Sequence, residues 1–379
     1  MYKIIQFTFV LLTLTSVVFA QTNQEAKRKE MIEKGVVYLR SAQAEDGSFS
    51  SHAGIGPTGI VLFGLLNADV PADDPMIAKG LKFLEKSKWE DGGIYTEGGA
   101  YGNYESCVAL QCFTEANRKL KAAKNLDKGP YDDLLAGCEK FVRAGQFTEQ
   151  RDISPGDMFY GGAGYGRHQR PDLSNTQFFV EALRNAGAKS DDPAIQKALI
   201  FVSRCQNMES QHNTTAFAAK NSDGGFIYTP VGEGESFAGE TPDGGLRSYG
   251  SMTYAGLKSM IYAGLTQDDP RVKAAYEWLK KHYDTESNPG LGDSGLFYYY
   301  TVFAKTFDVL NLEMFESADG QKHDWRNELI ESLAKRQQPD GSWLNANSRW
   351  LEGDPNLVTG YVLIVLGDCG KQFGNKFNF

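Results

Sequence analysis

Three segments of the chain share one pattern of polar and apolar positions. Each begins with Asp-Asp-Pro, at residues 73–75, 191–193 and 268–270. An Asp at the N-cap followed by Pro at the first helical position is a strong helix start. Apolar or aromatic residues follow at the second, sixth and ninth positions after each Pro, which is one face of an amphipathic helix. The pattern therefore predicts three helices, each with one buried side.

The same register continues into segments without this triplet. In most of them, an aromatic–aliphatic pair stands five and four residues before a Gln. Six units result, about 45 to 77 residues apart, and repeats of this length usually form stacked supersecondary units. The Gln or its equivalent in each unit is Gln43, Lys88, Gln146, Gln206, Tyr283 or Gln337.

A short turn with an Asp-Gly pair follows in four units, at residues 46–49, 91–94, 223–226 and 340–343. In the last of these turns, Gly341 lets the chain reverse tightly. We expect Gln337 to bind backbone groups at the helix end and Trp343 to pack over the next unit.

A second, more apolar segment follows in every unit. These segments are poor in charge and rich in small residues, and a helix that is apolar on nearly all sides is buried. They cover residues 57–66, 104–116, 173–186, 249–263, 295–310 and 356–367. Six such helices inside six amphipathic ones predict an all-α fold, an (α/α)6 toroid of six helix-pair repeats. Closing the ring removes the exposed ends that an open solenoid must cap.

The first twenty residues have the features of a secretory signal peptide. Lys3 precedes an apolar stretch from residue 4 to 18, and Val18 and Ala20 are small residues at a cleavage site. The stretch is short for a membrane span of about 20 residues, and no later segment is long and apolar enough to be one. We predict a signal peptide at 1–20, a single toroid domain at 21–379, and export to the periplasm or the extracellular space.

Charge and cysteine content narrow the classes of partner. The chain carries 39 basic and 48 acidic residues, a formal charge of −9, without basic clusters. This disfavours nucleic acid as a partner, because such binding needs clustered cations. The 5 cysteines are an odd number without a CxxC pair, and most lie in apolar helical segments, so we expect buried thiols. We expect a monomer.

The turn pattern resembles the QW repeat of squalene–hopene and oxidosqualene cyclases, whose toroid fold is shared by protein prenyltransferase β-subunits. Gln337, Gly341 and Trp343 match the repeat, with Ser332 in place of its aromatic residue, and the first unit matches with Phe49 for the Trp. The resemblance covers essentially the whole mature chain. It implies the fold but no activity, because the repeat residues are structural.

The resemblance to the cyclases does not extend to their acid. Class II cyclases protonate an alkene with the middle Asp of a D-x-D-D-T motif, which requires a strong acid. The best match here is residues 172–176, where Ser174 occupies the proton-donating position and Asn175 the last acidic one. The chain is also about half the length expected of such cyclases. We therefore expect that it does not cyclise squalene.

The zinc site of the prenyltransferases is missing as well. Those enzymes hold zinc with an Asp-x-Cys pair and a distant His. Here the only close pair is Asp368-Cys369, without the spacer, and the histidines are scattered. We expect neither a metal nor another cofactor.

A candidate site lies where the inner helices begin. A loop rich in Gly and Tyr, residues 160–172, leads into the third inner helix. If all inner helices run parallel, their N-termini meet at one mouth of the central cavity, together with Tyr101. Aromatic and polar groups around an apolar shaft are typical of a ligand pocket. The candidate ligand-binding residues are Tyr104, Tyr165, His168, Asp172, Asn175, Arg247, Tyr249, Asp293 and Tyr299. Structural roles account for the same residues without a ligand. Glycines and tyrosines would then serve in turns and packing, Asp172 would cap a helix, and Arg247 would form an ion pair with a neighbouring carboxylate.

The leading hypothesis is an exported toroid that binds or transforms an apolar, isoprenoid or lipid ligand in its cavity; no catalytic residue is assigned. One alternative is a polysaccharide lyase or glycosidase, with Asp157, Asp172 and Asp293 as acids and a carbohydrate ligand. Another is a non-catalytic interaction scaffold. A closed aromatic cavity favours the lipid, an open groove with paired acids favours the sugar, and a filled shaft favours the scaffold.

Overall fold

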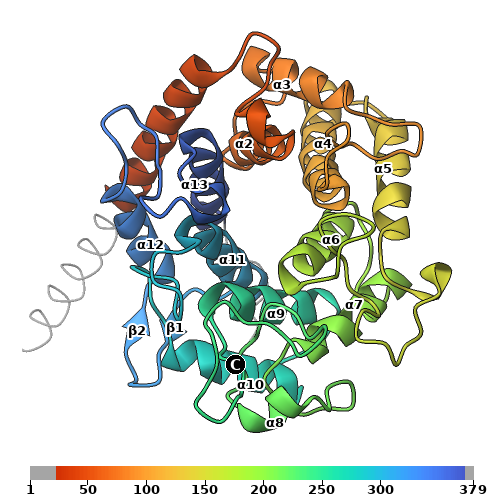
Figure 1. Cartoon of the computed structure of the whole chain (residues 1–379). Coiled ribbons are helices and arrows are strands. Elements are labelled where there is room, and N and C mark those ends of the chain that lie inside the picture. The colour runs from red at the N-terminus through yellow and green to blue at the C-terminus, as the bar shows by residue number, and fades with distance from the viewer. Residues whose placement is uncertain (1–22, 372–379) are drawn as a thin grey trace, which may run out of the picture.

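The computed structural model describes residues 23–371, which form a ring of helices (Figure 1). The predicted signal peptide lies outside these residues. The inner helices are α2 (Gly56–Asn67), α4 (Gly102–Lys124), α6 (Leu173–Asn185), α9 (Gly250–Tyr262), α11 (Leu296–Val309) and α13 (Pro355–Cys369). The outer helices are the segment 23–42, α3 (Pro75–Glu85), α5 (Asp132–Ala144), α7 (Pro193–Arg204), α10 (Pro270–Lys281) and α12 (Trp325–Ala334).

The remaining elements are short and lie in the connections. They are η1 (Ser51–Ala53), η2 (Glu149–Arg151), α8 (Ala216–Lys220), the hairpin of β1 (Phe315–Glu316) and β2 (Lys322–His323), and η3 (Arg349–Leu351). The strands pair antiparallel, with Phe315 opposite His323.

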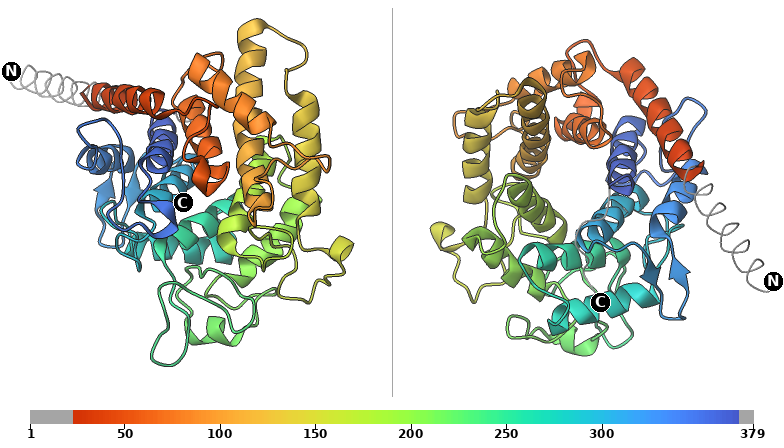
Figure 2. Two further views of the ribbon diagram at one scale, coloured as in Figure 1. Left: turned by 45° about the horizontal axis from the view of Figure 1, so that its top comes forward. Right: turned by 180° about the vertical axis from the view of Figure 1, so that it is seen from behind.

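The inner helices close into a ring. Going round it, α2 contacts α4, then α6, α9, α11 and α13 follow, and α13 returns to contact α2. Each outer helix stands behind the inner helices, as the view from the other side also shows (Figure 2). The predicted all-α toroid of six helix pairs is therefore confirmed.

The predicted bounds of the inner helices agree with the structure within two residues, except for α4. This helix continues to Lys124, whereas the apolar pattern predicts an end at residue 116. Its last turns carry Lys and Arg side chains and are exposed from residue 121 on. They extend past the ring together with α5 (Figure 2, left), so the polar sequence there does not mark a helix end.

The Asp-Asp-Pro triplets start helices as predicted. The carboxylates of Asp74, Asp192 and Asp269 accept hydrogen bonds from the backbone N–H two residues later, at 2.8, 2.8 and 2.9 Å. Each bond satisfies one of the N–H groups that a helix start leaves without a partner.

The Gln side chains of the turns join neighbouring units. Gln337 Nε2 donates to the carbonyl of Gly341 at 3.0 Å, and to that of Met31, in the segment 23–42, at 3.2 Å. Gln43, Gln146 and Gln206 make equivalent pairs of bonds. Both contacts expected of the last turn are present, and they tie the end of the ring to its beginning.

Contacts with the next unit explain why the last turn carries an aromatic residue and a glycine. Trp343 is fully buried, and its ring lies against Gly35 of the next unit, where a Cβ would be 3.2 Å from it. Gly341 has φ of +92°, and a Cβ there would lie 2.5 Å from the carbonyl oxygen of Lys34. A side chain at this position would therefore separate the two units.

Two further expectations concern cysteines and membranes. Cys107, Cys112, Cys138, Cys205 and Cys369 are free and buried, as predicted. Within residues 23–371, none of the helices combines the length and the apolar character that a membrane crossing needs.

Candidate functional site

A cavity of about 660 Å³ lies at the N-terminal ends of the inner helices. Its volume falls within the range of small-molecule sites, roughly 300–1,000 Å³. Tyrosines from both helices and loops dominate its wall, namely Tyr101, Tyr104, Tyr165, Tyr228, Tyr249, Tyr298 and Tyr361. Apolar side chains complete it, among them Phe178, Phe237, Met252, Trp350 and Leu357.

The rings in the wall pack against one another, some edge to face and some stacked. The ring centroid of Tyr104 lies 5.9 Å from that of Tyr165 and 5.2 Å from that of Phe178. Phe178 in turn stacks against Tyr298 at 6.1 Å, across from α6 to α11. These contacts restrict the ring orientations, and the rings present an apolar surface to the cavity.

The rim of the cavity is built by two loops. Trp350 packs against Phe237 with ring centroids 5.3 Å apart, and Arg349 lies over both rings. Trp350 has φ of 54°, a conformation that non-glycine residues seldom adopt. It also covers Gly295, where a Cβ would meet the Trp350 ring at 3.0 Å. The loop before α13 thereby reaches over the start of α11.

Most hydroxyls of the wall are already engaged. Tyr104 is hydrogen-bonded to Tyr361, and Tyr165 to Tyr228. Tyr228 is bonded to the carboxylate of Asp172. These groups hold one another in place.

Asp172 caps α6 directly behind the wall. Its carboxylate accepts hydrogen bonds from the backbone N–H of Asn175 at 2.8 Å and from Asn175 Nδ2 at 2.7 Å. Burial raises the pKa of Asp172 to about 6, although the bonds from Asn175 and Tyr228 oppose the shift. Because Asn175 Nδ2 is held by Asp172, the amide of Asn175 has a fixed orientation.

Ser174, the residue that the motif comparison sets against the cyclase acid, lines the cavity. Its Oγ donates to the Tyr298 hydroxyl at 3.0 Å, and Gln177 Nε2 donates to the same hydroxyl at 3.3 Å. A serine hydroxyl there cannot protonate an alkene. Ser174 is therefore part of a hydrogen-bond network that runs through Tyr298 and Gln177 to Lys258.

A polar layer closes the shaft beneath the cavity. Lys258, which is 2% exposed, donates to Gln177 Oε1 at 2.8 Å and forms an ion pair with Glu181. Burial lowers the pKa of Lys258, and the charge of Glu181 opposes that shift. Phe178 and Tyr361 line both the cavity and this layer, so they separate the two.

The structure brings four of the candidate residues together. Tyr104, Tyr165, Asn175 and Tyr249 all line the cavity, and so does Tyr101 at the exposed rim. Asp172 lies behind the wall and acts on it through Asn175. The first turns of the inner helices therefore do meet at one mouth, as the parallel arrangement predicts.

The other candidates lie elsewhere. His168, Arg247 and Asp293 are exposed and do not line the cavity, because their loops turn these side chains outward. The Nε of Arg247 donates to the carbonyl of Glu240, so the expected ion pair is replaced by a backbone contact.

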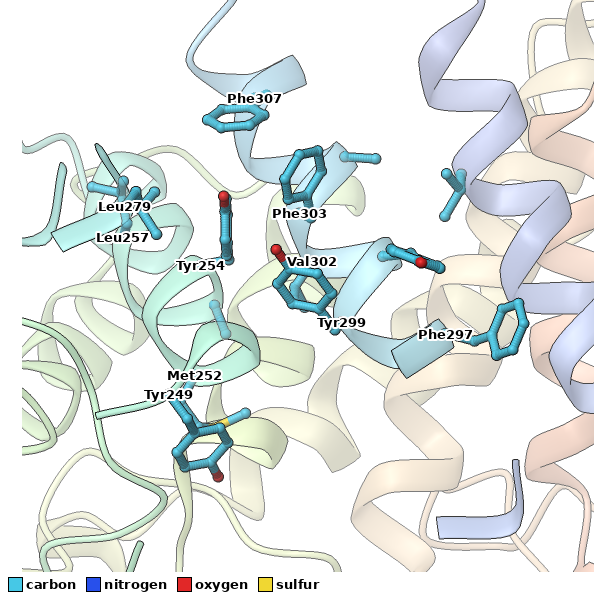
Figure 3. Close-up of a cluster of buried hydrophobic side chains, with 14 of the residues drawn as sticks. Tyr249, Met252, Tyr254, Leu257, Leu279, Phe297, Tyr299, Val302, Phe303 and Phe307 are labelled. Carbon is cyan, nitrogen blue, oxygen red and sulfur yellow. The ribbon is translucent and has the colours of Figure 1, made fainter. Parts of the chain in front are cut away.

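Tyr299 is also placed differently from the prediction. It lies in the core between α9 and α11, beside Tyr254 and Phe303 (Figure 3), with its hydroxyl bonded to the Asp284 carbonyl at 2.6 Å. Neighbouring residues on a helix point about 100° apart. Tyr298 therefore faces the cavity in place of Tyr299.

Several wall residues were not among the candidates. Phe178 and Tyr361 follow Ser174 and Leu357 by four residues, so the helical period could have identified them. The loop residues Tyr228, Phe237 and Trp350 carry no periodic signal.

Within the described residues, no group of three or more His, Cys, Asp or Glu side chains is placed to hold a metal ion. A single carboxylate, that of Glu105, belongs to the described wall, and it accepts bonds from the backbone N–H groups of Ile55 and Thr96.

Comparison with known proteins supports this fold. Residues 8–117 match the family model of the squalene-hopene cyclase C-terminal domain. No curated protein matches the sequence. One similar solved structure is a variant of the type II terpene cyclase MstE from Scytonema, in complex with geranylgeranyl dihydroxybenzoate. It has a TM-score of 0.52 and 12% sequence identity, and the alignment covers 92% of this chain and 99% of that chain.

Two further structures are similar to the same degree. An apo variant of MstE has a TM-score of 0.51 and 11% identity, covering 92% of this chain and 98% of that one. A protein from Actinoplanes has a TM-score of 0.50 and 13% identity, covering 91% and 100%. At such identities the likeness concerns the fold.

The comparison corrects one expectation from chain length. The alignment covers nearly all of both this chain and MstE, so a type II terpene cyclase can consist of about one such toroid. The expectation that a cyclase is about twice as long as this chain applies to cyclases with a second helical domain. It does not apply to every type II terpene cyclase. The chain resembles the terpenoid cyclase-like superfamily in sequence and has the α/α toroid fold of the type II terpene cyclases.

Proposed function

We propose that the protein binds an apolar, isoprenoid-class ligand in its central cavity. The observation that carries the proposal is a cavity of about 660 Å³ walled by tyrosines together with Phe178, Met252 and Leu357. Burying apolar ligand surface there releases roughly 25 cal/mol for each Å² removed from water. The ring packing described above keeps the wall in place without a ligand, which lowers the ordering cost of binding.

A cavity of about 660 Å³ suits a small-molecule ligand such as a linear isoprenoid of three or four prenyl units. The polar layer of Lys258 and Glu181 beneath it keeps a longer chain, such as squalene, from extending further down the shaft.

The wall does not support cyclisation started by an acid. Ser174 replaces the proton donor, and Asp172, the nearest carboxyl of that segment, lies behind the wall and is bonded to Asn175 and Tyr228. We therefore propose binding, with squalene returned unchanged after incubation. The turn contacts of Gln337 and Trp343 support an assignment of the units as QW-type repeats, and the features of residues 1–20 support export.

The alternatives have less support. A glycosidase needs two carboxyl groups about the scissile bond. Asp157, Asp172 and Asp293 do not line the cavity, and Glu105 is bonded to backbone N–H groups. An interaction scaffold would have a shaft filled with side chains rather than a cavity of this volume.

Ligand-dependent thermal unfolding tests the proposal. Farnesol or geranylgeraniol at about 100 times its Kd should add about 2.7 kcal/mol to the free energy of unfolding, whereas squalene and oligosaccharides should add far less. Tyr165→Ala and Asn175→Leu, both in the wall, should weaken this stabilisation.

His168→Ala is the matched control, because His168 belongs to the same loop as Tyr165 but is exposed outside the cavity. This variant should respond to ligand like the wild type. No stabilisation by any isoprenoid, or equal losses in Tyr165→Ala and His168→Ala, would contradict the proposal.

A further inference from the structure

We infer that the ligand is uncharged and carries a hydrogen-bond-accepting oxygen, which the hydroxyls of Tyr298 and Tyr249 bind beside Ser174. The inference rests on the proposed function and narrows its ligand class. Three observations support it: the directions of the hydrogen bonds at Tyr298, the unpaired hydroxyl of Tyr249, and the lack of cations in the described wall.

The bond directions at Tyr298 follow from Lys258. A lysine ammonium can only donate, so Gln177 Oε1 must be the acceptor of its 2.8 Å bond. The amide group of Gln177 then presents Nε2 to the Tyr298 hydroxyl. Ser174 Oγ donates to the same oxygen. The Tyr298 oxygen thus accepts two bonds, and its own proton remains available for a group in the cavity.

Tyr249 supplies a second donor. It begins α9, is 2% exposed and lines the cavity. Its hydroxyl points away from the core cluster around Tyr254 and Phe303 (Figure 3), and it makes no hydrogen bond within the described residues. Burial raises the pKa of Tyr249, and the nearby Tyr298 phenol adds to the shift. Tyr249, Tyr298 and Ser174 all line the same cavity, so both phenols can reach a ligand that fills it.

The described wall offers an anionic ligand no Lys or Arg side chain as a counter-charge, and Arg349, over the rings of Phe237 and Trp350, is exposed at the rim. Lys258, in the polar layer beneath the cavity, is paired with Glu181 and bonded to Gln177. Burial also raises the pKa of Tyr298, so both phenols stay protonated. A diphosphate or carboxylate would lie in this site without a counter-charge, which is costly.

A neutral oxygen fits the two donors. A ketone, ether or alcohol oxygen accepts two hydrogen bonds, whereas a pure hydrocarbon leaves the protons of both phenols without an acceptor. A site built to bind a polar group rejects the analogue that lacks it, since its buried groups stay unpaired. The two bonds together correspond to roughly a tenfold difference in Kd, about threefold for each bond.

Calorimetric titration with a matched ligand pair tests the inference. The probes are farnesylacetone, an isoprenoid ketone, and its analogue in which C=CH2 replaces C=O. The wild type should bind the ketone roughly tenfold more tightly, and farnesyl diphosphate should bind more weakly than either. In Tyr298→Phe and in Tyr249→Phe the ketone preference should fall toward unity. The control Tyr299→Phe removes the adjacent hydroxyl, which lies in the core, and should keep the preference.

The ratio of the two Kd values is taken within each variant, so a general loss of affinity cancels. Equal Kd values for both probes in the wild type would overturn the inference while leaving the proposed function intact. Tighter binding of the diphosphate, or a ketone preference that survives both tyrosine substitutions, would also overturn it. If neither probe binds at all, the proposed function itself fails.

Discussion

Replacing Asp172 with Asn removes a buried carboxyl whose ionisation opposes folding. The Asn side chain keeps an oxygen that accepts the bond from the backbone N–H of Asn175, so α6 keeps its cap. The Asn amide nitrogen cannot accept the bond from Asn175 Nδ2, so the absolute stability changes as well. The effect of charge is therefore taken from the pH dependence of the stability difference and not from its value at one pH. The substitution also tests the environment of the wall, because Asp172 holds Asn175 and Tyr228.

The magnitude follows from the pKa. The value rises from 3.8 to about 6, because burial favours the neutral form. Below the lower value both the folded and the unfolded chain carry the proton, and no cost arises. Between the two values the unfolded chain ionises first, so wild-type stability falls as pH rises. One pKa unit corresponds to about 1.4 kcal/mol, so the full loss is about 3 kcal/mol.

Urea unfolding between about pH 3.5 and 7 measures this effect. The free energy of unfolding of Asp172→Asn minus that of the wild type should increase by about 3 kcal/mol over this range. Asp74→Asn is the control with the opposite sign. Asp74 caps α3, and its bond to Arg40 lowers its pKa, so this variant should lose stability relative to the wild type as pH rises. A flat pH profile for Asp172→Asn would refute the reasoning.

Four further predictions concern closure, charge, metal and export. Gln337→Leu removes the bonds to Met31 and Gly341 and should cost about 1–3 kcal/mol by urea unfolding, whereas Gln338→Leu, at an exposed position, should cost little. Lys258→Met leaves Glu181 buried without its cation and should cost about 3–5 kcal/mol, most of which Glu181→Leu should restore in the double variant. EDTA should leave the melting temperature unchanged, and one zinc per chain by elemental analysis would contradict this. N-terminal sequencing of protein from its native host should begin at Gln21; a chain that retains residues 1–20 would disprove cleavage.

The parts of the fold that depend on local sequence were predictable. The Asp-Asp-Pro starts and the Gln337–Gly341 turn act through bonds to backbone groups nearby or in the next unit, so their pattern repeats visibly. The end of α4 was not predictable, because its last turns extend past the ring and need no apolar residues. The apolar pattern therefore marks the end of the continuously buried part of α4 and not the end of the helix.

The site was predictable in part for a similar reason. Tyr104 and Asn175 lie in first helical turns, whose position in a toroid follows from the fold. In the run of tyrosines that begins at Tyr298, a phase difference of one residue decides which ring faces the cavity, and the sequence does not fix that phase. Trp350 reaches the rim through a backbone with positive φ and through contact with Phe237, more than one hundred residues away. No local pattern encodes such a contact.

Ligand binding in the central cavity is tested most directly by a crystal structure of the protein grown with saturating farnesylacetone. The ligand chain should lie in the cavity against Phe178, with its ketone oxygen within hydrogen-bond distance of the Tyr298 and Tyr249 hydroxyls. An empty cavity at saturating ligand, or a ligand bound only on the outer surface of the ring, would contradict the account.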